Sequence, residues 1–175
     1  MNHSTRVRNT PNPMKIKIIT IGVYGFDETG FFDALCNANV DTFCDIRNRR
    51  GVRGTTYAFA NSKRLQARLE ELGIRYIYRK DLGPTKSVRE KQAAADKATK
   101  TPKRKRTELG EVFIEAYRTE CLNAFDPQSL LDELESDAQV VALFCVETTP
   151  EACHRSLVAE KLANTFDLEV EDILP

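Results

Sequence analysis

The stretch Val140-Val-Ala-Leu-Phe-Cys-Val146 is the most apolar segment of the sequence and decides the fold class. A short continuous apolar run is typical of a strand that lies inside a sheet and is covered by helices on both faces. We therefore expect residues 140–146 to form the central strand of a sheet.

Other apolar runs on both sides of this segment alternate with helical patterns. Runs rich in β-branched and aromatic residues predict further strands at 15–21, 40–46, 74–78 and 168–174. Apolar residues at helical spacing predict helices over 27–37, 61–72, 108–122, 127–134 and 151–166. Asp27 or Thr29 can cap the first helix, Asn61 or Ser62 the second, and Gly73 suits the end of the second.

The alternation of strands and helices predicts an α/β fold in a single domain of 15–175, after a flexible N-terminus of 1–14. We expect a mostly parallel sheet of four to five strands with helices on both faces, a Rossmann-like three-layer arrangement. Residues 86–107 are rich in Lys, Ala and Thr and contain Pro102. This segment is interpreted as a basic insertion that is mobile or forms a surface helix.

The composition excludes several classes of protein. No apolar run approaches the roughly 20 residues that a membrane span requires, and the N-terminal residues lack the apolar stretch of a secretory signal. The five cysteines are odd in number and unevenly spaced, which favours a reducing compartment over a disulfide framework. We therefore expect a cytoplasmic protein with no membrane partner.

The formal net charge is zero, but the charges are unevenly distributed along the chain. Between Arg47 and Arg106 there are 19 Lys and Arg against 5 Asp and Glu, so this part carries +14 and the remainder −14. A basic segment of this kind indicates a polyanion such as a nucleic acid or a nucleotide, or else a solvated surface.

Four segments lie at the carboxyl ends of the expected strands: 22–24, 45–47, 78–83 and 145–155. In parallel α/β sheets, ligands bind in the crevice outside these strand ends. The sequence therefore predicts one cleft formed by all four segments.

The segment from Cys145 to Arg155 contains the strongest candidates for chemistry. His154 is a natural proton carrier near neutral pH, and Glu147 can act as a base. Cys153, His154 and Arg155 would lie near the N-terminus of a helix, where an anion can bind. The alternatives are a structural histidine bonded to a carbonyl and a Glu147 carboxylate paired with Arg155 or Arg47.

Asp45-Ile-Arg47 ends the second expected strand, and the two-residue period aims both charges at the predicted cleft. We expect Asp45 to orient reacting groups and Arg47 to bind phosphate. Arg49, Arg50 and Arg53 follow, and Tyr57 offers a nearby stacking face. Guanidinium groups can bind phosphate in a bidentate manner, although a solvated arginine loop would have the same sequence.

A metal site is the weaker interpretation, and the sequence predicts neither a metal nor a cofactor. Cys145, Cys153 and His154 are potential zinc ligands. However, the two cysteines are not spaced as a CxxC pair, and no second pair with zinc-ligand spacing is present.

Several elements occur in the order of a known family. These are Ile19-Thr-Ile-Gly22, Asp45-Ile-Arg47, Leu72-Gly-Ile-Arg-Tyr76, Asp81-Leu-Gly83, and Cys145-Val-Glu147 with Cys153-His-Arg155. Together they resemble the domain of unknown function 488 family over about residues 16–175. The resemblance implies an α/β domain with a shared cleft, but no activity.

The sequence departs from the family's pattern at two positions. Val23-Tyr24 stands where the family usually has His-Ser, so the resemblance implies no role for this loop, and Tyr24 is a candidate ligand contact on its own chemistry. Leu82-Gly83-Pro84 replaces the usual Leu-Gly-Gly and precedes the basic insertion, where we expect substrate contacts particular to this protein.

Three functions fit these residues. The leading hypothesis is an enzyme that processes nucleic acid or nucleotides, with an arginine-rich phosphate loop and proton transfer by Glu147 and His154. The second is a rhodanese-like transferase that depends on Cys145 or Cys153, suggested by a fainter likeness in the Asp-x-Arg and strand-end cysteine. The third is a non-catalytic module that binds a phosphorylated ligand or nucleic acid, so enzymatic activity and oligomeric state stay open.

Overall fold

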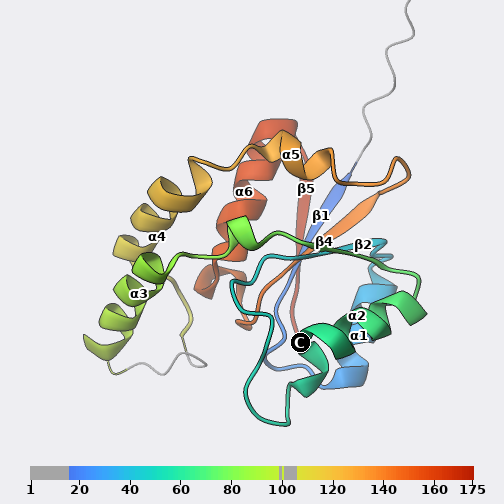
Figure 1. Cartoon of the computed structure of the whole chain (residues 1–175), viewed down its shortest axis with the longest axis horizontal. Helices are drawn as coiled ribbons and strands as arrows, with labels where there is room; N and C mark the ends of the chain where they lie inside the picture. The colour runs from blue at the N-terminus through green and yellow to red at the C-terminus, as the bar shows by residue number, and fades with distance from the viewer. Residues whose placement is uncertain (1–15, 99, 101–105) are drawn as a thin grey trace, which may run out of the picture.

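The computed structural model describes residues 16–98, 100 and 106–175, and these residues form one five-stranded parallel sheet in the order β3-β2-β4-β1-β5 (Figure 1). The strands are β1 (Lys17–Ile21), β2 (Thr42–Asp45), β3 (Arg75–Tyr78), β4 (Val140–Phe144) and β5 (Glu169–Ile173). The expected central strand is confirmed, because β4 pairs with β2 on one side and β1 on the other. All pairings are parallel.

Helices cover both faces of the sheet, as the sequence predicted (Figure 1). The helices are α1 (Glu28–Asn37), α2 (Ser62–Glu71), α3 (Lys86–Ala98), α4 (Glu111–Tyr117), α5 (Pro127–Leu131) and α6 (His154–Phe166). Helices α1 and α2 pack on one face, while α4, α5 and α6 pack on the other with α3 beside α4. This is the expected three-layer α/β architecture.

The core follows from the alternation of side chains along β4. Ala142 and Phe144 face the layer of α1 and α2, where Phe144 packs against Phe31 with ring centroids 5.6 Å apart. Val141 and Leu143 face the layer of α6. Because successive side chains of a strand point to opposite faces, an all-apolar strand supplies both cores at once.

Local signals explain where several helices begin and end. Asp27 caps α1, because its Oδ1 accepts a hydrogen bond of 2.7 Å from the amide of Gly30. Gly73 ends the second helix with a φ of +70°, the left-handed conformation that glycine adopts readily. Asn61 precedes α2, but its Oδ1 accepts from the amide of Val52 and makes no cap hydrogen bond.

Three expected helices have different bounds in the structure. The helix expected over 108–122 is α4 followed by the π-helical turn η4 (Arg118–Leu122), and α5 ends at Leu131. Near the candidate site, the 3-10 turn η5 (Pro150–Ala152) precedes α6. Cys153 is extended between the two, so α6 begins at His154.

The segment expected to be a basic insertion, 86–107, contains α3 over its first 13 residues. Val88 and Gln92 are buried, and α3 packs against α4. Residue 99 and residues 101–105 of this segment lie outside the described residues, as does the expected flexible N-terminus of 1–14.

The topology places a crevice at the carboxyl end of β4. The connections after β1 and β2, the neighbours of β4, run through α1 and α2 on one face, whereas the connection after β4 runs through α6 on the other. Such divergence creates the crevice in which parallel sheets bind ligands. Within the described part of the chain, no helix combines the length and apolarity needed to cross a bilayer.

Candidate functional site

A cavity of about 570 Å³ lies at the carboxyl ends of β2 and β4, bordered by α3 and by the loop that follows β2. Its floor includes Cys145, Glu147, Cys153 and His154. The arginines in its wall are Arg47, Arg49, Arg53, Arg89 and Arg106. The cavity therefore brings reactive and cationic side chains from distant parts of the sequence together.

The floor contains a compact cluster of two thiols and one imidazole. Nδ1 of His154 lies 3.8 Å from Sγ of Cys145 and 3.9 Å from Sγ of Cys153. All three side chains are buried. Cys145 directly follows β4, whereas Cys153 and His154 stand at the start of α6, so two rigid elements fix the cluster.

A backbone contact determines which ring nitrogen of His154 faces the sulfur atoms. Nε2 lies 3.2 Å from the carbonyl oxygen of Ile46, which can only accept a hydrogen bond. Nε2 therefore carries a proton, and in the neutral ring Nδ1 presents its lone pair to the thiols. The same contact joins the Asp-Ile-Arg turn to the Cys-His-Arg turn, which the sequence analysis expected to be neighbours.

The two cysteines differ in acidity. Burial raises the pKa of Cys153, but a hydrogen bond from Cys145 and the charge of His154 outweigh it and hold this pKa well below its ordinary value. The hydrogen bond to Cys153, together with burial, raises the pKa of Cys145. Burial lowers the pKa of His154, yet the thiolate of Cys153 raises it overall. Cys153 is thus the more acidic of the two thiols.

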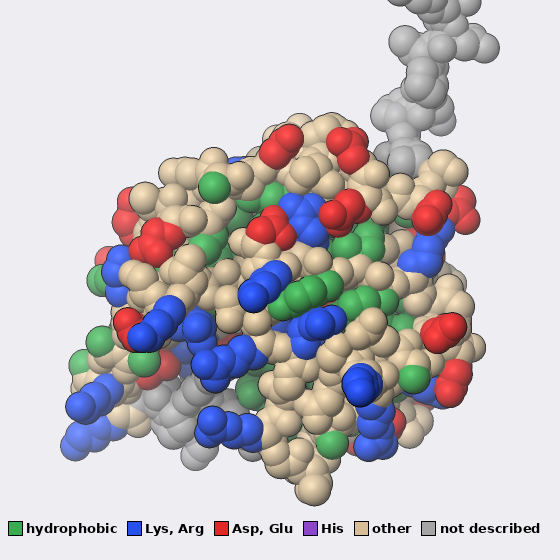
Figure 2. Space-filling model, in the orientation of Figure 1, with side chains coloured by type: hydrophobic (Ala, Val, Ile, Leu, Met, Phe, Trp, Pro, Cys, Tyr) green, Lys and Arg blue, Asp and Glu red, His purple; other side chains and the backbone are tan. Residues whose placement is uncertain are grey.

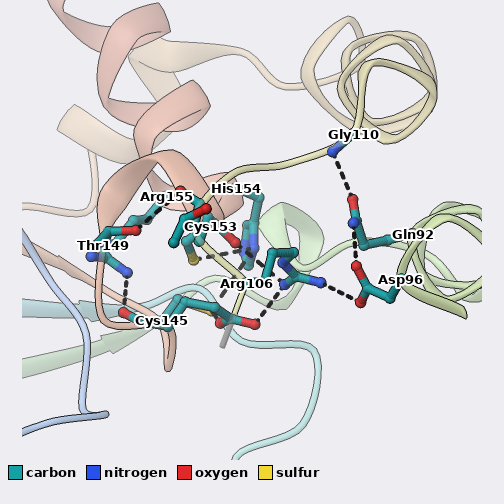
Figure 3. Close-up of polar contacts among 12 residues, drawn as sticks. Gln92, Asp96, Arg106, Gly110, Cys145, Thr149, Cys153, His154 and Arg155 are labelled. Atoms are coloured by element: carbon teal, nitrogen blue, oxygen red, sulfur yellow. Dashed lines mark hydrogen bonds and ion pairs between the residues drawn. The ribbon is translucent and has the colours of Figure 1, made fainter. Parts of the chain in front are cut away.

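Glu147 is joined to α3 by a chain of polar contacts (Figure 3). Arg106 donates from Nη2 to Oε1 of Glu147 at 2.8 Å and from Nη1 to Asp96 at 3.0 Å. Gln92 then donates to Asp96 and accepts from the amide of Gly110 at the start of α4. Buried polar networks of this kind hold their members in fixed positions.

Arg155 is fully buried and holds the backbone of the site. Its guanidinium donates to the carbonyl oxygens of Glu147 and Thr148 at 2.7 and 3.1 Å, and to Oγ1 of Thr20 at 3.2 Å. It is not among the residues that line the cavity. Gly22 packs against the same loop so closely that a Cβ there would lie 1.7 Å from the carbonyl oxygen of Glu147.

Asp45 and Arg47 form a buried ion pair beneath the cavity. Nε and Nη2 of Arg47 donate to the two carboxylate oxygens of Asp45, and Nη1 donates to the carbonyl oxygen of Ala60. The hydroxyl of Tyr76 also donates to Asp45, and burial together with this carboxylate raises the pKa of Tyr76 to about 12. The guanidinium of Arg47 is therefore largely satisfied inside the protein.

The remaining predicted ligand residues divide into two groups. Arg49, Arg53 and Tyr24 line the cavity. Arg50 lies over the ring of Tyr78, with its Cζ 4.2 Å from the ring centroid, and does not line the cavity. Tyr57 packs against Tyr24 with the ring planes tilted by 52° and the centroids 5.1 Å apart, and its hydroxyl accepts from the amide of Gly25.

The structure therefore gathers most of the predicted residues but gives some of them internal partners. Arg89 and Arg106 also line the cavity and were not among the residues predicted from the sequence. Both lie in the expected basic insertion, where the sequence offers no signal that separates them from neighbouring solvated lysines and arginines. The ion pairs with Glu147 and Asp96 distinguish Arg106.

Comparison with known proteins gives one match. The family described as domain of unknown function DUF488 matches residues 29–162, which is most of the chain and includes both the Asp-Ile-Arg and the Cys-His-Arg elements. No curated protein and no solved structure matches the chain.

Proposed function

Because the chain belongs to the DUF488 family, a domain of unknown function, we propose an activity from the geometry of the site. The protein is an enzyme that binds a phosphate-bearing ligand of nucleotide size in the cavity and acts on it at the cysteine–histidine floor. The observation that carries this proposal is that Arg49 and Arg53 line the same cavity as Cys145, Glu147 and His154.

The arginines of the cavity differ in their availability. Arg47 and Arg106 are engaged by carboxylates, as described above. Across residues 16–98, 100 and 106–175, no hydrogen bond or ion pair engages the guanidinium of Arg49 or Arg53, and both side chains are exposed. Two uncommitted guanidinium groups beside a buried floor favour a dianionic group such as phosphate.

The size of the cavity favours a small ligand over a long polymer. A volume of about 570 Å³ lies within the range of small-molecule sites. Tyr24 adds an aromatic ring to the wall, and aromatic rings can stack on a nucleobase. These features support a nucleotide, or the terminal nucleotide of a strand, as the occupant.

The surface around the cavity also supports an anionic partner. Figure 2 shows lysine and arginine side chains spread over the middle of one face, with acidic side chains mostly at its borders. A field of one sign attracts an anion and speeds its association, and this effect weakens as salt is added. The surface therefore supports nucleic acid as a further candidate ligand, because a nucleic acid presents the same phosphate groups as a nucleotide.

Calorimetric titration with nucleoside mono-, di- and triphosphates and with short DNA and RNA strands tests the proposal. We expect Arg49→Ala/Arg53→Ala to weaken binding about a hundredfold or more, because two charge-assisted contacts are lost and each contributes about 1.5–3 kcal/mol. The control Arg64→Ala/Arg68→Ala removes two exposed arginines of α2, outside the cavity, and should bind as the wild type does. The proposal fails if no phosphate-bearing compound binds, or if both double variants bind equally well.

A second function is favoured by one specific observation, the position of Cys153. Its sulfur lies 3.9 Å from Nδ1 of His154, and the residue directly precedes α6. A thiolate beside an imidazolium at a helix N-terminus is the usual setting of a nucleophilic cysteine. In this alternative the substrate becomes attached to Cys153, and mass spectrometry of protein quenched with acid during turnover would detect the adduct.

A further inference from the structure

We propose that Cys145, Cys153 and His154 bind a zinc ion at the floor of the cavity and leave its fourth position open to the cavity. Among the residues that the structure describes, these three form the single group of His, Cys, Asp and Glu whose potential ligand atoms meet, all within 4.8 Å of one another.

The spacing of the three ligand atoms fits tetrahedral zinc. Zinc binds sulfur at about 2.3 Å and imidazole nitrogen at about 2.0–2.1 Å, which places tetrahedral sulfur and nitrogen ligands about 3.6 Å apart. The two sulfur–nitrogen separations are 3.8 and 3.9 Å. The two sulfur atoms lie no more than 4.8 Å apart, whereas tetrahedral zinc places two sulfur ligands about 3.8 Å apart. Movements of at most about 1 Å would therefore bring both cysteines and the histidine to bonding distance of one ion.

The orientation of His154 supports the same conclusion. Its Nδ1 faces the two sulfur atoms, and its Nε2 donates to the carbonyl oxygen of Ile46. Histidines that bind metals usually donate their other ring nitrogen to a carbonyl or carboxylate, which fixes the ring and raises its basicity. Ile46 directly follows strand β2, whereas His154 is the first residue of α6, so this contact belongs to the tertiary structure.

The site has the composition of a catalytic rather than a structural zinc centre. Structural zinc sites in proteins are closed by four protein ligands, whereas catalytic sites have three and keep one position for water or substrate. Cys145, Cys153 and His154 all line the cavity, so a small molecule in the cavity can reach the fourth position.

Glu147 lines the same cavity as the three proposed ligands. Its Oε2 is 4.0 Å from Sγ of Cys145, while Oε1 accepts from Arg106. A glutamate that neighbours a zinc ion without binding it can serve as the general base of a hydrolytic reaction. Arg106 then acts as a positioning residue, because it holds the carboxylate and does not itself touch the reacting atoms.

The chemistry of such a centre, which rests on the proposed function, is hydrolysis of a phosphate ester. Cys145, Cys153 and His154 would hold the ion, and the ion would lower the pKa of a water molecule beside it. Oε2 of Glu147 would take a proton from this water as the water oxygen forms a bond to phosphorus and the phosphorus–oxygen bond to the leaving group breaks. Glu147 then returns the proton to the leaving oxygen, so water and ester become phosphate and alcohol.

Metal analysis of the whole protein tests the zinc site directly. The protein is first stripped of metal with a chelator and then dialysed against zinc at micromolar concentration. We expect elemental analysis by inductively coupled plasma mass spectrometry to find one zinc ion per chain. Cobalt(II) in place of zinc should give the thiolate-to-cobalt charge-transfer absorption and the intense visible bands of a tetrahedral site. Binding in Cys145→Ser and in Cys153→Ser should be largely lost.

Cys36→Ser is the matched control, because Cys36 is an exposed free cysteine on α1. It should bind zinc as the wild type does. Substoichiometric zinc, a cobalt spectrum without charge-transfer absorption, or undiminished zinc binding in folded Cys153→Ser would overturn the proposal. The wild-type cobalt spectrum keeps the test decisive even if the cysteine variants do not fold.

The two proposals fail separately. Binding of nucleotides through Arg49 and Arg53 without stoichiometric zinc would refute the zinc site and leave the proposed function in place. Stoichiometric zinc bound by Cys145, Cys153 and His154, with no affinity for any phosphate-bearing compound, would refute the proposed function and leave the zinc site in place.

Discussion

The guanidinium of Arg47 donates hydrogen bonds of 2.9 and 2.7 Å to the carboxylate of Asp45, and both side chains are buried. Removal of one partner from a buried pair leaves an uncompensated charge, which costs about 3–5 kcal/mol. We therefore expect Arg47→Met to lower the free energy of unfolding by about this amount in urea denaturation.

The surface pair of Arg68 and Glu71 provides the control for this measurement. Arg68→Met removes the same charge from an exposed ion pair, where the expected loss is below about 1 kcal/mol. If Arg47→Met instead keeps wild-type stability but no longer binds phosphate-bearing ligands, Arg47 is a ligand contact and not a structural one.

A second prediction concerns the close approach of Gly22 to the loop after β4. A Cβ at this position would lie 1.7 Å from the carbonyl oxygen of Glu147, so Gly22→Ala must displace the loop. We expect a loss of about 1–3 kcal/mol in the free energy of unfolding, together with weaker ligand binding. In Gly110→Ala the new Cβ would make only ordinary contacts of 3.7 Å, and equal losses in both variants would contradict the packing argument.

The link between α3 and the site depends on Arg106. Arg106→Gln leaves Asp96 and Glu147 without their shared cation, and we expect faster hydrogen exchange in 86–98 and a stability loss of about 1–3 kcal/mol. The control Arg118→Gln breaks an exposed pair with Glu160 and should leave the exchange of α3 unchanged. Equal exchange of α3 in all three proteins would show that Arg106 does not hold this helix.

The acidity of Cys153 predicts a pH profile for alkylation of metal-free protein. Its lowered pKa means that the thiolate is present below the pKa of about 8.5 of an ordinary cysteine, so iodoacetamide should label it with a midpoint below that value. Cys145→Ala removes the hydrogen-bond donor that lowers this pKa and should move the midpoint to higher pH. Identical profiles for Cys153 in the wild type and in Cys145→Ala would refute this account of its acidity.

Zinc should also stabilise the fold, because it binds the folded chain through residues from two elements. At a free zinc concentration of about 100 times Kd, the gain is about 2.7 kcal/mol, which corresponds to a rise in Tm of about 5–10 °C for a chain of this size. Thermal unfolding with zinc and with chelator measures the difference. The same shift in Cys153→Ser would mean that zinc acts elsewhere.

Much of the architecture was predictable because it depends on local patterns. The apolar run of β4, the cap at Asp27 and the turn at Gly73 are short-range signals, and each lies where the sequence placed it. Parallel strands align their carboxyl ends, so the sequence also predicted that the turns after β2 and β4 would be neighbours. The contact between His154 and Ile46 joins these two turns.

The helix bounds near the site were less predictable. The pattern of 151–166 suggested one helix, whereas the 3-10 turn and the extended Cys153 delay α6 until His154. The later start of α6 sets the direction of the Cys153 side chain. The side chain of an extended residue before the first helical turn points in another direction than that of a residue inside the turn.

By itself, the sequence determined the strands, the three layers and the edge of the sheet where the candidate site residues lie. Hydrophobic periodicity is enough to predict the strands and layers, and the parallel direction of the strands is enough to predict this edge. Only the tertiary structure decided which charged and sulfur-bearing groups have partners. Arg47 and Arg155 are satisfied inside the protein, Arg49 and Arg53 face the cavity, and Cys145 meets Cys153 and His154. The physical reason is that these contacts act over a few ångströms between segments far apart in the chain, a separation that spacing along the sequence does not encode.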